Sequence, residues 1–143
     1  MSVVFWDTNL FIYLIEQKGS YDKVKGLRIK MIENKDILVT STLTLGELLS
    51  KPYKENRVDL VNKYRQLLTS RAVELVEFDT KVAENYAKIR AKYTRQEIAP
   101  PDAIQLACAS AFGVDVFYTN DDRLTEKVID GIGAIKSIQG EDI

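Results

Sequence analysis

Two short and nearly continuous apolar runs, Val3–Trp6 and Val114–Tyr118, stand out along the chain, and Asp115 is the one charged residue within them. Nearly unbroken apolar runs of this length are typical of central strands that are covered on both faces. Ile37–Thr40 is similar but has only three apolar residues before its threonine. Val73–Phe78 alternates in part between apolar and acidic residues, and Ala134–Ile138 also mixes polar with apolar positions. The last two runs are therefore predicted to be more exposed strands at the edges of a sheet.

Between these runs, apolar residues recur at the three- and four-residue spacing of amphipathic helices. Two of the periodic segments follow Ser20 and Asp79, residue types that favour the N-cap of a helix. The segment Pro101–Phe112 is rich in alanine and almost free of charge, so it is predicted to be a buried helix that ends at Gly113. A short helix is also expected around Arg123–Val128. The periodic positions are Tyr21, Val24, Leu27 and Met31; Val58, Val61, Tyr64 and Leu68; and Val82, Tyr86, Ile89 and Tyr93.

Strands that alternate with helices predict an α/β fold with a mostly parallel central sheet of about five strands. The chain has 143 residues and shows no internal repeat, low-complexity stretch or linker, so residues 1–143 are expected to form one domain. In such sheets, ligands bind beyond the carboxyl ends of the strands, where the strand order reverses. The residues that directly follow the strands are therefore the first candidates for a functional site.

The composition adds a cellular context. Hydrophobic residues make up 45% of the chain and charged residues 29%, as in soluble globular proteins. No apolar run approaches the roughly 20 residues that cross a bilayer, and the first residues lack the basic start of a signal peptide. The single cysteine, Cys108, excludes an internal disulfide and fits a reducing compartment. We therefore expect a cytoplasmic protein with no membrane association.

The chain contains no histidine, and its net charge is −1. Without histidine, Ser-His-Asp and Cys-His catalysis and His-containing zinc sites are excluded. General acid–base chemistry would fall to carboxylates, lysine, tyrosine or metal-bound water. A net charge of −1 is not the strongly basic character of a general nucleic-acid-binding protein. Any nucleic acid would have to be held by a local basic patch or through bound metal ions.

Four acidic residues occupy places where a strand ends or a helix begins. Asp7 and Asp121 follow the two central strands, Glu47 lies in an apolar helical stretch, and Asp102 lies in the first turn of the alanine-rich helix. In a parallel sheet all four would face the same edge. Carboxylates that are packed together repel each other unless a cation lies between them. Oxygen ligands of this kind suit Mg²⁺ or Mn²⁺, which indicates metal-dependent phosphodiester chemistry.

Each of these acids also has a purely structural explanation. Asp7 can be the N-cap of the helix that follows it, and Glu47 can complete a capping box with Thr44. The charge of Asp102 can be stabilised by the dipole of its helix. Asp121 or the acid after it can cap a polar turn, and the spacing does not decide which of the two faces the site. The joint placement of the four acids favours a common site, because four independent caps need not converge.

The strings around these acids are Asp7-Thr8-Asn9, Leu45-Gly46-Glu47-Leu48, Asp102-Ala103-Ile104-Gln105-Leu106-Ala107 and Thr119-Asn120-Asp121. Together, and in this order, they resemble the motifs of the PIN-domain nucleases, and a chain of this length resembles the VapC-type toxins of toxin–antitoxin pairs. The resemblance covers nearly the whole chain. It implies a PIN-like three-layer α/β/α fold in which the strands before Asp7 and Asp121 are neighbours. It also implies a Mg²⁺- or Mn²⁺-dependent ribonuclease, a homodimer and a cognate antitoxin that inhibits it.

The resemblance makes the four acids the candidates for catalysis and metal binding, with secondary ligands or supporting groups beside them. RNA phosphates would be contacted by basic residues that lead toward Asp102, interleaved with Tyr93. An alternative is that these basic residues form the solvated face of an amphipathic helix. The candidate catalytic and metal-binding residues are Asp7, Glu47, Asp102 and Asp121; the secondary candidates are Thr8, Asn9, Thr119, Asn120 and Asp122; the candidate RNA-binding residues are Lys88, Arg90, Lys92 and Arg95.

Other functions remain open at this point. A PIN-domain endonuclease that processes RNA without an antitoxin would carry the same acids. A PIN-like module that only binds RNA would usually have lost some of them, and none is missing here. A phosphatase of the haloacid-dehalogenase type also begins with a strand and an Asp, but it requires a second Asp two residues later, where this chain has Asn9. The sequence does not indicate which RNA is cut or how many metal ions bind.

Overall fold

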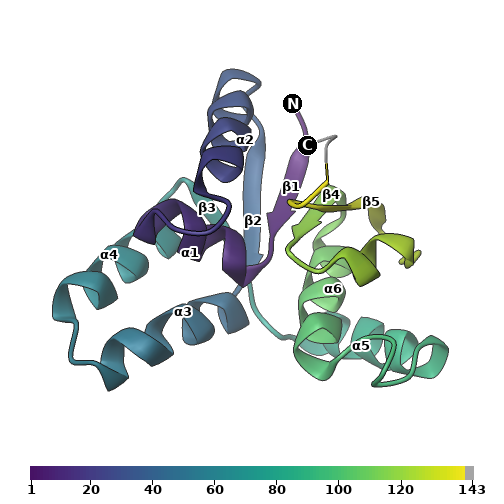
Figure 1. The fold of residues 1–143 in the computed structure, drawn as a ribbon. Helices are drawn as coiled ribbons and strands as arrows, with labels where there is room; N and C mark the ends of the chain where they lie inside the picture. The colour runs from purple at the N-terminus through teal and green to yellow at the C-terminus, as the bar shows by residue number, and fades with distance from the viewer. Residues whose placement is uncertain (141–143) are drawn as a thin grey trace.

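A sheet of five parallel strands forms the centre of the molecule in the computed structural model, which describes residues 1–140 (Figure 1). Its strands are β1 (Val3–Trp6), β2 (Ile37–Ser41), β3 (Val73–Val76), β4 (Val114–Thr119) and β5 (Ile132–Ser137). Their order across the sheet is β3-β2-β1-β4-β5, and every pair of neighbours is parallel. The predicted α/β class and the two predicted edge strands are confirmed.

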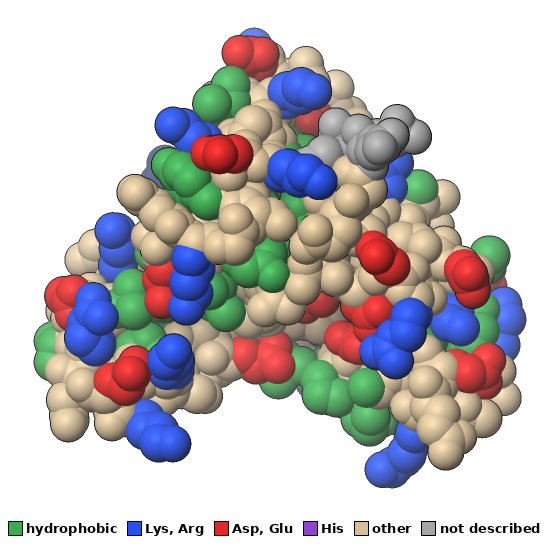
Figure 2. Space-filling model, viewed as in Figure 1, with side chains coloured by type: hydrophobic (Ala, Val, Ile, Leu, Met, Phe, Trp, Pro, Cys, Tyr) green, Lys and Arg blue, Asp and Glu red, His purple; other side chains and the backbone are tan. Residues whose placement is uncertain are grey.

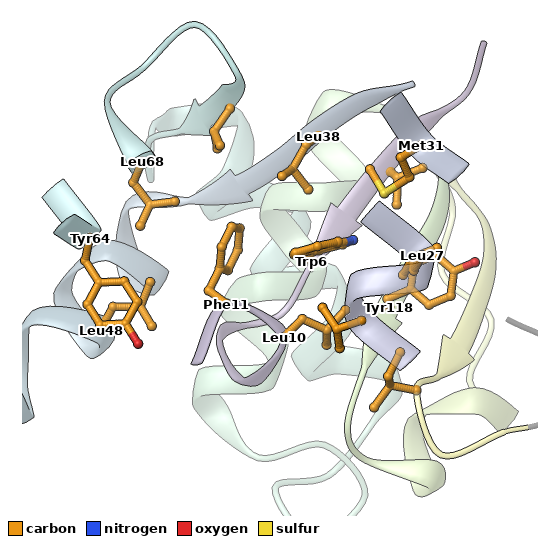
Figure 3. Packing of buried hydrophobic residues seen from close by; sticks show 14 residues of the cluster. Trp6, Leu10, Phe11, Leu27, Met31, Leu38, Leu48, Tyr64, Leu68 and Tyr118 are labelled. Atoms are coloured by element: carbon orange, nitrogen blue, oxygen red, sulfur yellow. The ribbon is translucent and has the colours of Figure 1, made fainter. Parts of the chain in front are cut away.

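Six α-helices and one 3₁₀ helix connect the strands and cover both faces of the sheet. They are α1 (Thr8–Glu16), α2 (Tyr21–Glu33), α3 (Thr42–Lys54), α4 (Val58–Leu68), α5 (Thr80–Lys92), α6 (Pro100–Phe112) and the 3₁₀ helix η1 (Asp122–Glu126). Helices α1 to α4 pack on one face, in a core that includes Trp6, Leu38 and Tyr118 from the strands (Figure 3). Helices α5 and α6 pack on the other face, against Phe5 and Phe117. The result is a three-layer α/β/α arrangement.

The alternation of side chains along each strand explains why both faces are covered. Val4 and Trp6 of β1 belong to the core on one face, whereas Phe5, between them, belongs to the core on the other. All three are nearly inaccessible to solvent, with exposed fractions of 4%, 0% and 0% for Val4, Phe5 and Trp6. A strand that is buried on both faces needs an unbroken apolar sequence, which is what the run Val3–Trp6 provides.

Several local predictions are refined by the structure. Asp79 is the N-cap of α5, and its side chain accepts a hydrogen bond from the amide of Val82 at 2.9 Å, as predicted. Ser20 occupies the N-cap position of α2, but its side chain makes no capping hydrogen bond. The segment around Arg123–Val128 forms the 3₁₀ helix η1 rather than an α-helix. Helix α6 is buried along most of its length and ends at Gly113, as predicted.

The strand order determines where a site can form. The chain runs from β1 outward to β2 and β3, then crosses to the other side of β1 and continues with β4 and β5. The order therefore reverses between β1 and β4, which pair directly through Val4 with Val116, Phe5 with Phe117 and Trp6 with Tyr118. Residues that follow these two strands meet at the switch point, where α/β proteins bind ligands. None of the helices within residues 1–140 is long and apolar enough to span a bilayer.

Candidate metal centre

Asp7 lies at the end of β1 and is held by both of the central strands. Its backbone amide donates to the carbonyl oxygen of Tyr118 at 3.0 Å. Its Oδ1 accepts from the amide of Thr8 at 2.7 Å, so Asp7 is the N-cap of α1. Its Oδ2 accepts from the hydroxyl of Thr119 at 3.1 Å. The capping role and the placement at the switch point are therefore compatible, because each uses a different oxygen.

Thr119 connects the first and last acids of the site. It is the final residue of β4 and is fully buried. Its hydroxyl donates to Asp7 and accepts from the amide of Asp121 at 3.1 Å. This hydroxyl therefore fixes the start of the turn that carries Asp121 relative to the carboxylate of Asp7. Thr119, a secondary candidate in the sequence analysis, acts in the structure as a support for the acids.

Glu47 reaches the site from α3. The capping-box explanation is wrong, because the N-cap of α3 is Ser41, whose hydroxyl accepts from the amide of Thr44 at 3.2 Å. Glu47 lies farther along the helix, where its Oε1 accepts from the hydroxyl of Thr8 at 2.6 Å. The side chain is exposed, so its charge remains in contact with solvent. Glu47 is oriented by a neighbour of Asp7.

Asp102 is the third residue of α6 and is half-buried. Pro100 and Pro101 occupy the first two helical positions, so the helix begins one residue before the predicted start at Pro101. The carboxylate has no hydrogen-bond donor among residues 1–140, in contrast to Asp7, Asp121 and Glu47. The next turn of α6 is fully buried against the sheet, so the position of Asp102 is set by the packing of the helix.

The shifts in pKa indicate that these four acids interact electrostatically. Burial raises the pKa of Asp7 from 3.8 to about 6, with further contributions from the charges of Asp102 and Glu47, against opposing hydrogen bonds from the Thr8 amide and the Thr119 hydroxyl. Burial also raises the pKa of Asp102, and the charges of Asp121 and Glu47 raise it further. The four acids, which are separated along the chain, thus lie close enough to repel one another.

Asp121 has a partner that the sequence analysis missed. Arg123 donates from Nε to Oδ1 of Asp121 at 3.1 Å and from Nη2 to Oδ2 at 2.9 Å. This hydrogen-bonded pair holds the pKa of Asp121 below its ordinary value. Asp121 is also the N-cap of η1, and its charge, rather than that of the exposed Asp122, contributes to the raised pKa of Asp102. A signal was present, because an arginine two residues after an acid in a polar turn can fold back on it.

The acids surround an open cavity of about 590 Å³ at this edge of the sheet. The space-filling view shows a hollow between the arm formed by α3 and α4 and the arm formed by α5 and α6, with acidic side chains around it (Figure 2). Glu47 does not line the cavity itself. The lining residues are Asp7, Asn9, Asp102, Thr119, Asn120, Asp121, Asp122 and Arg123. The secondary candidates Asn9, Thr119, Asn120 and Asp122 are thus brought together with three of the four acids.

A buried polar network lies beneath the acids and was also missed. Its centre is Gln105 of α6, whose exposed fraction is 1%. The Gln105 amide donates to the hydroxyl of Thr44 at 2.7 Å and to that of Thr8 at 3.3 Å, and its carbonyl oxygen accepts from Ser41. Thr40 completes the network by donating to the carbonyl oxygen of Trp6 at 2.8 Å. The network joins β1, β2, α1, α3 and α6, and a lone polar residue on an apolar helix was its signal in the sequence.

The donor set suits a divalent cation, although the side chains are not arranged around one. No group of three or more acidic or cysteine side chains within residues 1–140 is positioned to hold a metal ion as it stands. The physical reason is visible in the contacts, because Glu47 is bonded to Thr8 and Asp121 to Arg123. Burial and neighbouring acids raise the pKa of Asp7 and of Asp102, and the charge of Arg123 only partly offsets this at Asp102. Hard oxygen donors in this condition fit Mg²⁺ or Mn²⁺.

The predicted RNA-binding residues do not line the acidic cavity. Lys88 and Lys92 border a separate cavity of about 140 Å³ between α5, α6 and the segment before β5. The guanidinium of Arg90 is turned inward, where Nη2 donates to the carbonyl oxygen of Ile98 and the other two nitrogens are buried without partners in residues 1–140. Arg95 is exposed in the loop between α5 and α6. The four residues therefore do not form one surface.

The fold and the acidic residues at its switch point define an α/β protein with an acidic site at the carboxyl edge of its sheet. The sequence profile of the PIN domain matches residues 4–129. The chain belongs to the PIN-domain family, which is a family of nucleases. A comparison with curated proteins gave no match.

Solved structures with the same fold are similar over almost the whole chain. One is VapBC2 from Rickettsia felis, bound to a DNA fragment from its own promoter. It is 18% identical to this chain with a TM-score of 0.74, and the match covers 94% of this chain and 98% of that one. DNA-bound VapBC from Salmonella typhimurium has 24% identity and a TM-score of 0.66, and the match covers 96% of this chain and 99% of that one. FitAcB from Neisseria gonorrhoeae has 22% identity and a TM-score of 0.63, and the match covers 82% of this chain and 87% of that one. These similarities show a shared fold.

Proposed function

We propose that this chain is a Mg²⁺- or Mn²⁺-dependent endoribonuclease and the toxin of a VapBC-type toxin–antitoxin pair. The observation that supports it most is the cavity at the switch point, which Asp7, Asp102 and Asp121 line together; burial and then the charges of Asp102 and Glu47 raise the pKa of Asp7 there. Carboxylates that lie close enough to repel one another at the switch point of a PIN-domain sheet are suited to binding a divalent cation. The structures of similar fold are those of toxin–antitoxin proteins.

The residues would divide the work as follows. Asp7, Glu47 and Asp102 would hold the metal, with Asp121 contributing directly or through water. A bound divalent ion lowers the pKa of its water and stabilises charge on a phosphodiester. Thr8 and Thr119 would keep Glu47 and Asp7 in position through their hydroxyl groups, which is the usual task of groups around metal ligands. With no histidine in the chain, proton transfer would rest on carboxylates and water.

The same proposal includes the partners. As a VapC-type toxin the chain would be cytoplasmic, would form a homodimer and would be inhibited by a small antitoxin. The alternative is a PIN-domain endonuclease that processes RNA and has no antitoxin. The two differ in their genomic neighbour, because a toxin of this type is encoded beside a short antitoxin reading frame.

The test is to express the chain together with its genomic neighbour and purify the chain through an affinity tag. A toxin should retain the neighbouring protein, and the chain released from it should degrade single-stranded RNA with Mg²⁺ or Mn²⁺. Added EDTA should stop the degradation, and Asp7→Asn should show none. Degradation that is equal in EDTA and in Asp7→Asn would contradict the metal-dependent nuclease. Degradation without any co-purified neighbour would favour the RNA-processing alternative.

A further inference from the structure

Arg123 is the one basic residue among the described residues that line the acidic cavity. Four aspartates share this lining, so an approaching polyanion such as RNA would meet a negative surface. The guanidinium of an arginine stays protonated at every physiological pH. A permanently positive group is thus placed at the wall of the cavity where a phosphate would have to enter.

The backbone of Arg123 is fixed, whereas its side chain is free to move. Its amide donates to Oδ1 of Asp121 at 2.9 Å, and the next residue, Leu124, is buried with an exposed fraction of 1%. The side chain itself is 78% exposed. Ion pairs that are exposed to this degree contribute little to stability. The guanidinium can therefore leave Asp121 at small cost while its point of attachment stays at the edge of the cavity.

The chemistry of the guanidinium suits a phosphate better than a lysine would. Arginine presents a planar fork of donors that matches two oxygens of a carboxylate or of a phosphate. In this structure the fork already holds both oxygens of Asp121. A phosphate diester offers the same pair of acceptor oxygens and carries one negative charge, so it can replace the carboxylate with little change in geometry.

The basic residues on α5 do not provide this contact. Lys88 and Lys92 border the other cavity, and the Arg90 guanidinium faces the carbonyl oxygen of Ile98. If RNA is cleaved beside Asp7 and Asp102, at least one of its phosphates has to lie within the acidic cavity, which these residues do not line. Arg123 is the basic group that lies there.

We propose that Arg123 binds a backbone phosphate of RNA in the acidic cavity and that its guanidinium exchanges Asp121 for this phosphate. In the free protein, the ion pair between Arg123 and Asp121 holds the guanidinium at the cavity wall and neutralises the carboxylate of Asp121. On RNA binding the arginine moves to the phosphate, and Asp121 becomes available to the metal centre. This assignment rests on the proposed ribonuclease function and adds the residue that recognises the substrate.

The experiment compares wild type with Arg123→Gln, Arg123→Lys and the control Arg71→Gln. Arg71 is exposed and precedes β3, at the opposite edge of the sheet from the acids. The first readout is the kinetics of cleavage of a fluorescein-labelled single-stranded RNA in Mn²⁺. Loss of a charged contact to phosphate should raise KM roughly tenfold in Arg123→Gln, and the salt dependence of log KM should weaken by about one unit of slope. Arg123→Lys should restore part of the loss, because it keeps the charge without the fork.

The second readout is the affinity for Mn²⁺ without RNA, measured by titration calorimetry. Arg123→Gln should bind Mn²⁺ several-fold more tightly than wild type, because the guanidinium no longer competes for Asp121. A merely structural role of the ion pair would instead weaken Mn²⁺ binding, since the turn at Asp121 would be less well ordered. The proposal thus predicts opposite changes for RNA and for metal in one variant, while Arg71→Gln should behave as wild type in both.

The possible results distinguish a failure of the role assigned to Arg123 from a failure of the proposed ribonuclease function. If wild type cleaves the RNA and Arg123→Gln keeps the wild-type KM, or if Arg71→Gln shows the same increase, the assignment of Arg123 is overturned and the ribonuclease stands. Weaker Mn²⁺ binding by Arg123→Gln would also overturn it. If wild type cleaves no RNA in Mn²⁺ although it binds the ion, the proposed ribonuclease itself is wrong, and the assignment falls with it.

Discussion

The hydroxyl of Thr8 donates to Oε1 of Glu47 at 2.6 Å and thereby ties the first turn of α1 to α3. The hydroxyl oxygen of Thr8 also accepts a hydrogen bond from the side-chain amide of Gln105 at 3.3 Å. Because Thr8 is the acceptor in this bond, its hydroxyl hydrogen remains available for Glu47. The orientation of an exposed carboxylate is in this way determined by a buried amide on a third helix. Cooperative networks of this kind fix a polar group more firmly than one bond does.

Replacing Thr8 by valine should impair catalysis more than stability. Valine has nearly the same shape but no hydroxyl, so Glu47 would lose its donor while the packing of α1 is kept. Loss of a supporting hydrogen bond around a metal site typically costs 10- to 100-fold in metal affinity or activity, and we expect about that loss in Thr8→Val. Mn²⁺ titration and RNA cleavage rates measure it. Thr8→Ser keeps the hydroxyl and should recover most of the activity, and equal losses in both variants would contradict the role of the hydrogen bond.

Replacing Gln105 by leucine should lower the stability of the fold. The change leaves the buried hydroxyl of Ser41 without its acceptor, whereas the hydroxyl of Thr44 loses the amide but still accepts from Thr40 at 2.9 Å. One buried polar group left unsatisfied costs about 1–3 kcal/mol. We expect the free energy of unfolding in urea to fall by about that amount. Gln66→Leu is a matched control, because Gln66 is an exposed residue of α4. A loss in Gln105→Leu no larger than in this control would show that the network does not stabilise the fold.

Neutralising Asp7 or Asp102 should abolish metal-dependent RNA cleavage, because each change removes a proposed metal ligand. Both Asp7→Asn and Asp102→Asn keep the size of the side chain, so the cleavage assay reports the lost charge and donor. Full activity in either variant would contradict the assigned roles. Circular dichroism spectra that match wild type would show that the fold is kept.

The Asp102→Asn variant should also show whether the carboxylate of Asp102 destabilises the metal-free fold through repulsion or stabilises it by capping α6. Without metal, the carboxylate of Asp102 is half-buried and is repelled by Asp121 and Glu47, so its neutralisation should leave the melting temperature in EDTA equal to or higher than that of wild type. A helix-capping role predicts the opposite, because the helix dipole would lose its negative partner. A clear drop in melting temperature would therefore support capping.

The pKa of Asp7 predicts a particular pH dependence of stability. Its value is raised from 3.8 to about 6 in the folded protein, so ionisation favours the unfolded chain. The stabilising effect of the protonated carboxyl is present below about pH 4 and is lost as the pH rises to about 6. At neutral pH without metal, the loss amounts to about 3 kcal/mol relative to a neutral side chain. Urea unfolding in EDTA between pH 4 and 7, for wild type and Asp7→Asn, measures the difference.

Asp7→Asn is suited to this comparison because asparagine can still accept the capping hydrogen bond from the amide of Thr8. The carboxylates that do not interact with Asp7 titrate alike in both proteins, so their contributions cancel in the difference. We expect the two stabilities to be close near pH 4 and to diverge toward pH 7, with the variant more stable. Parallel curves would mean that Asp7 does not carry the raised pKa.

The fold was largely predictable because it depends on short-range patterns. The nearly continuous apolar runs identified β1 and β4 as central strands, and the mixed runs identified β3 and β5 as edges. Spacing of apolar residues located most of the helices. The positions of Asp7 and Asp102 followed from the same patterns, because the end of a strand and the start of a helix can be read locally.

The details that the sequence did not reveal depend on side-chain partners from distant parts of the chain. Glu47 was read as half of a local capping box, whereas its partner is Thr8, 39 positions away. Gln105 looked like an exception on an apolar helix until three other elements supplied its hydrogen bonds. Basic residues on α5 were expected near the acids from their closeness in sequence to Asp102, but helix geometry directs them elsewhere. Arg123 was overlooked because a single arginine in a turn has no periodic signal.

The central position of β1 has a consequence for synthesis of the protein. Strand β1 is completed on one side by β2 and on the other by β4, and the amide of Asp7 is held by Tyr118. A nascent chain that ends before residue 114 already contains Asp7, Glu47 and Asp102 but lacks strand β4, which pairs with β1 and holds Asp7 in place. The ribosome therefore has to deliver more than three quarters of the polypeptide before any of the proposed RNA hydrolysis can begin, and prematurely terminated products should be inert.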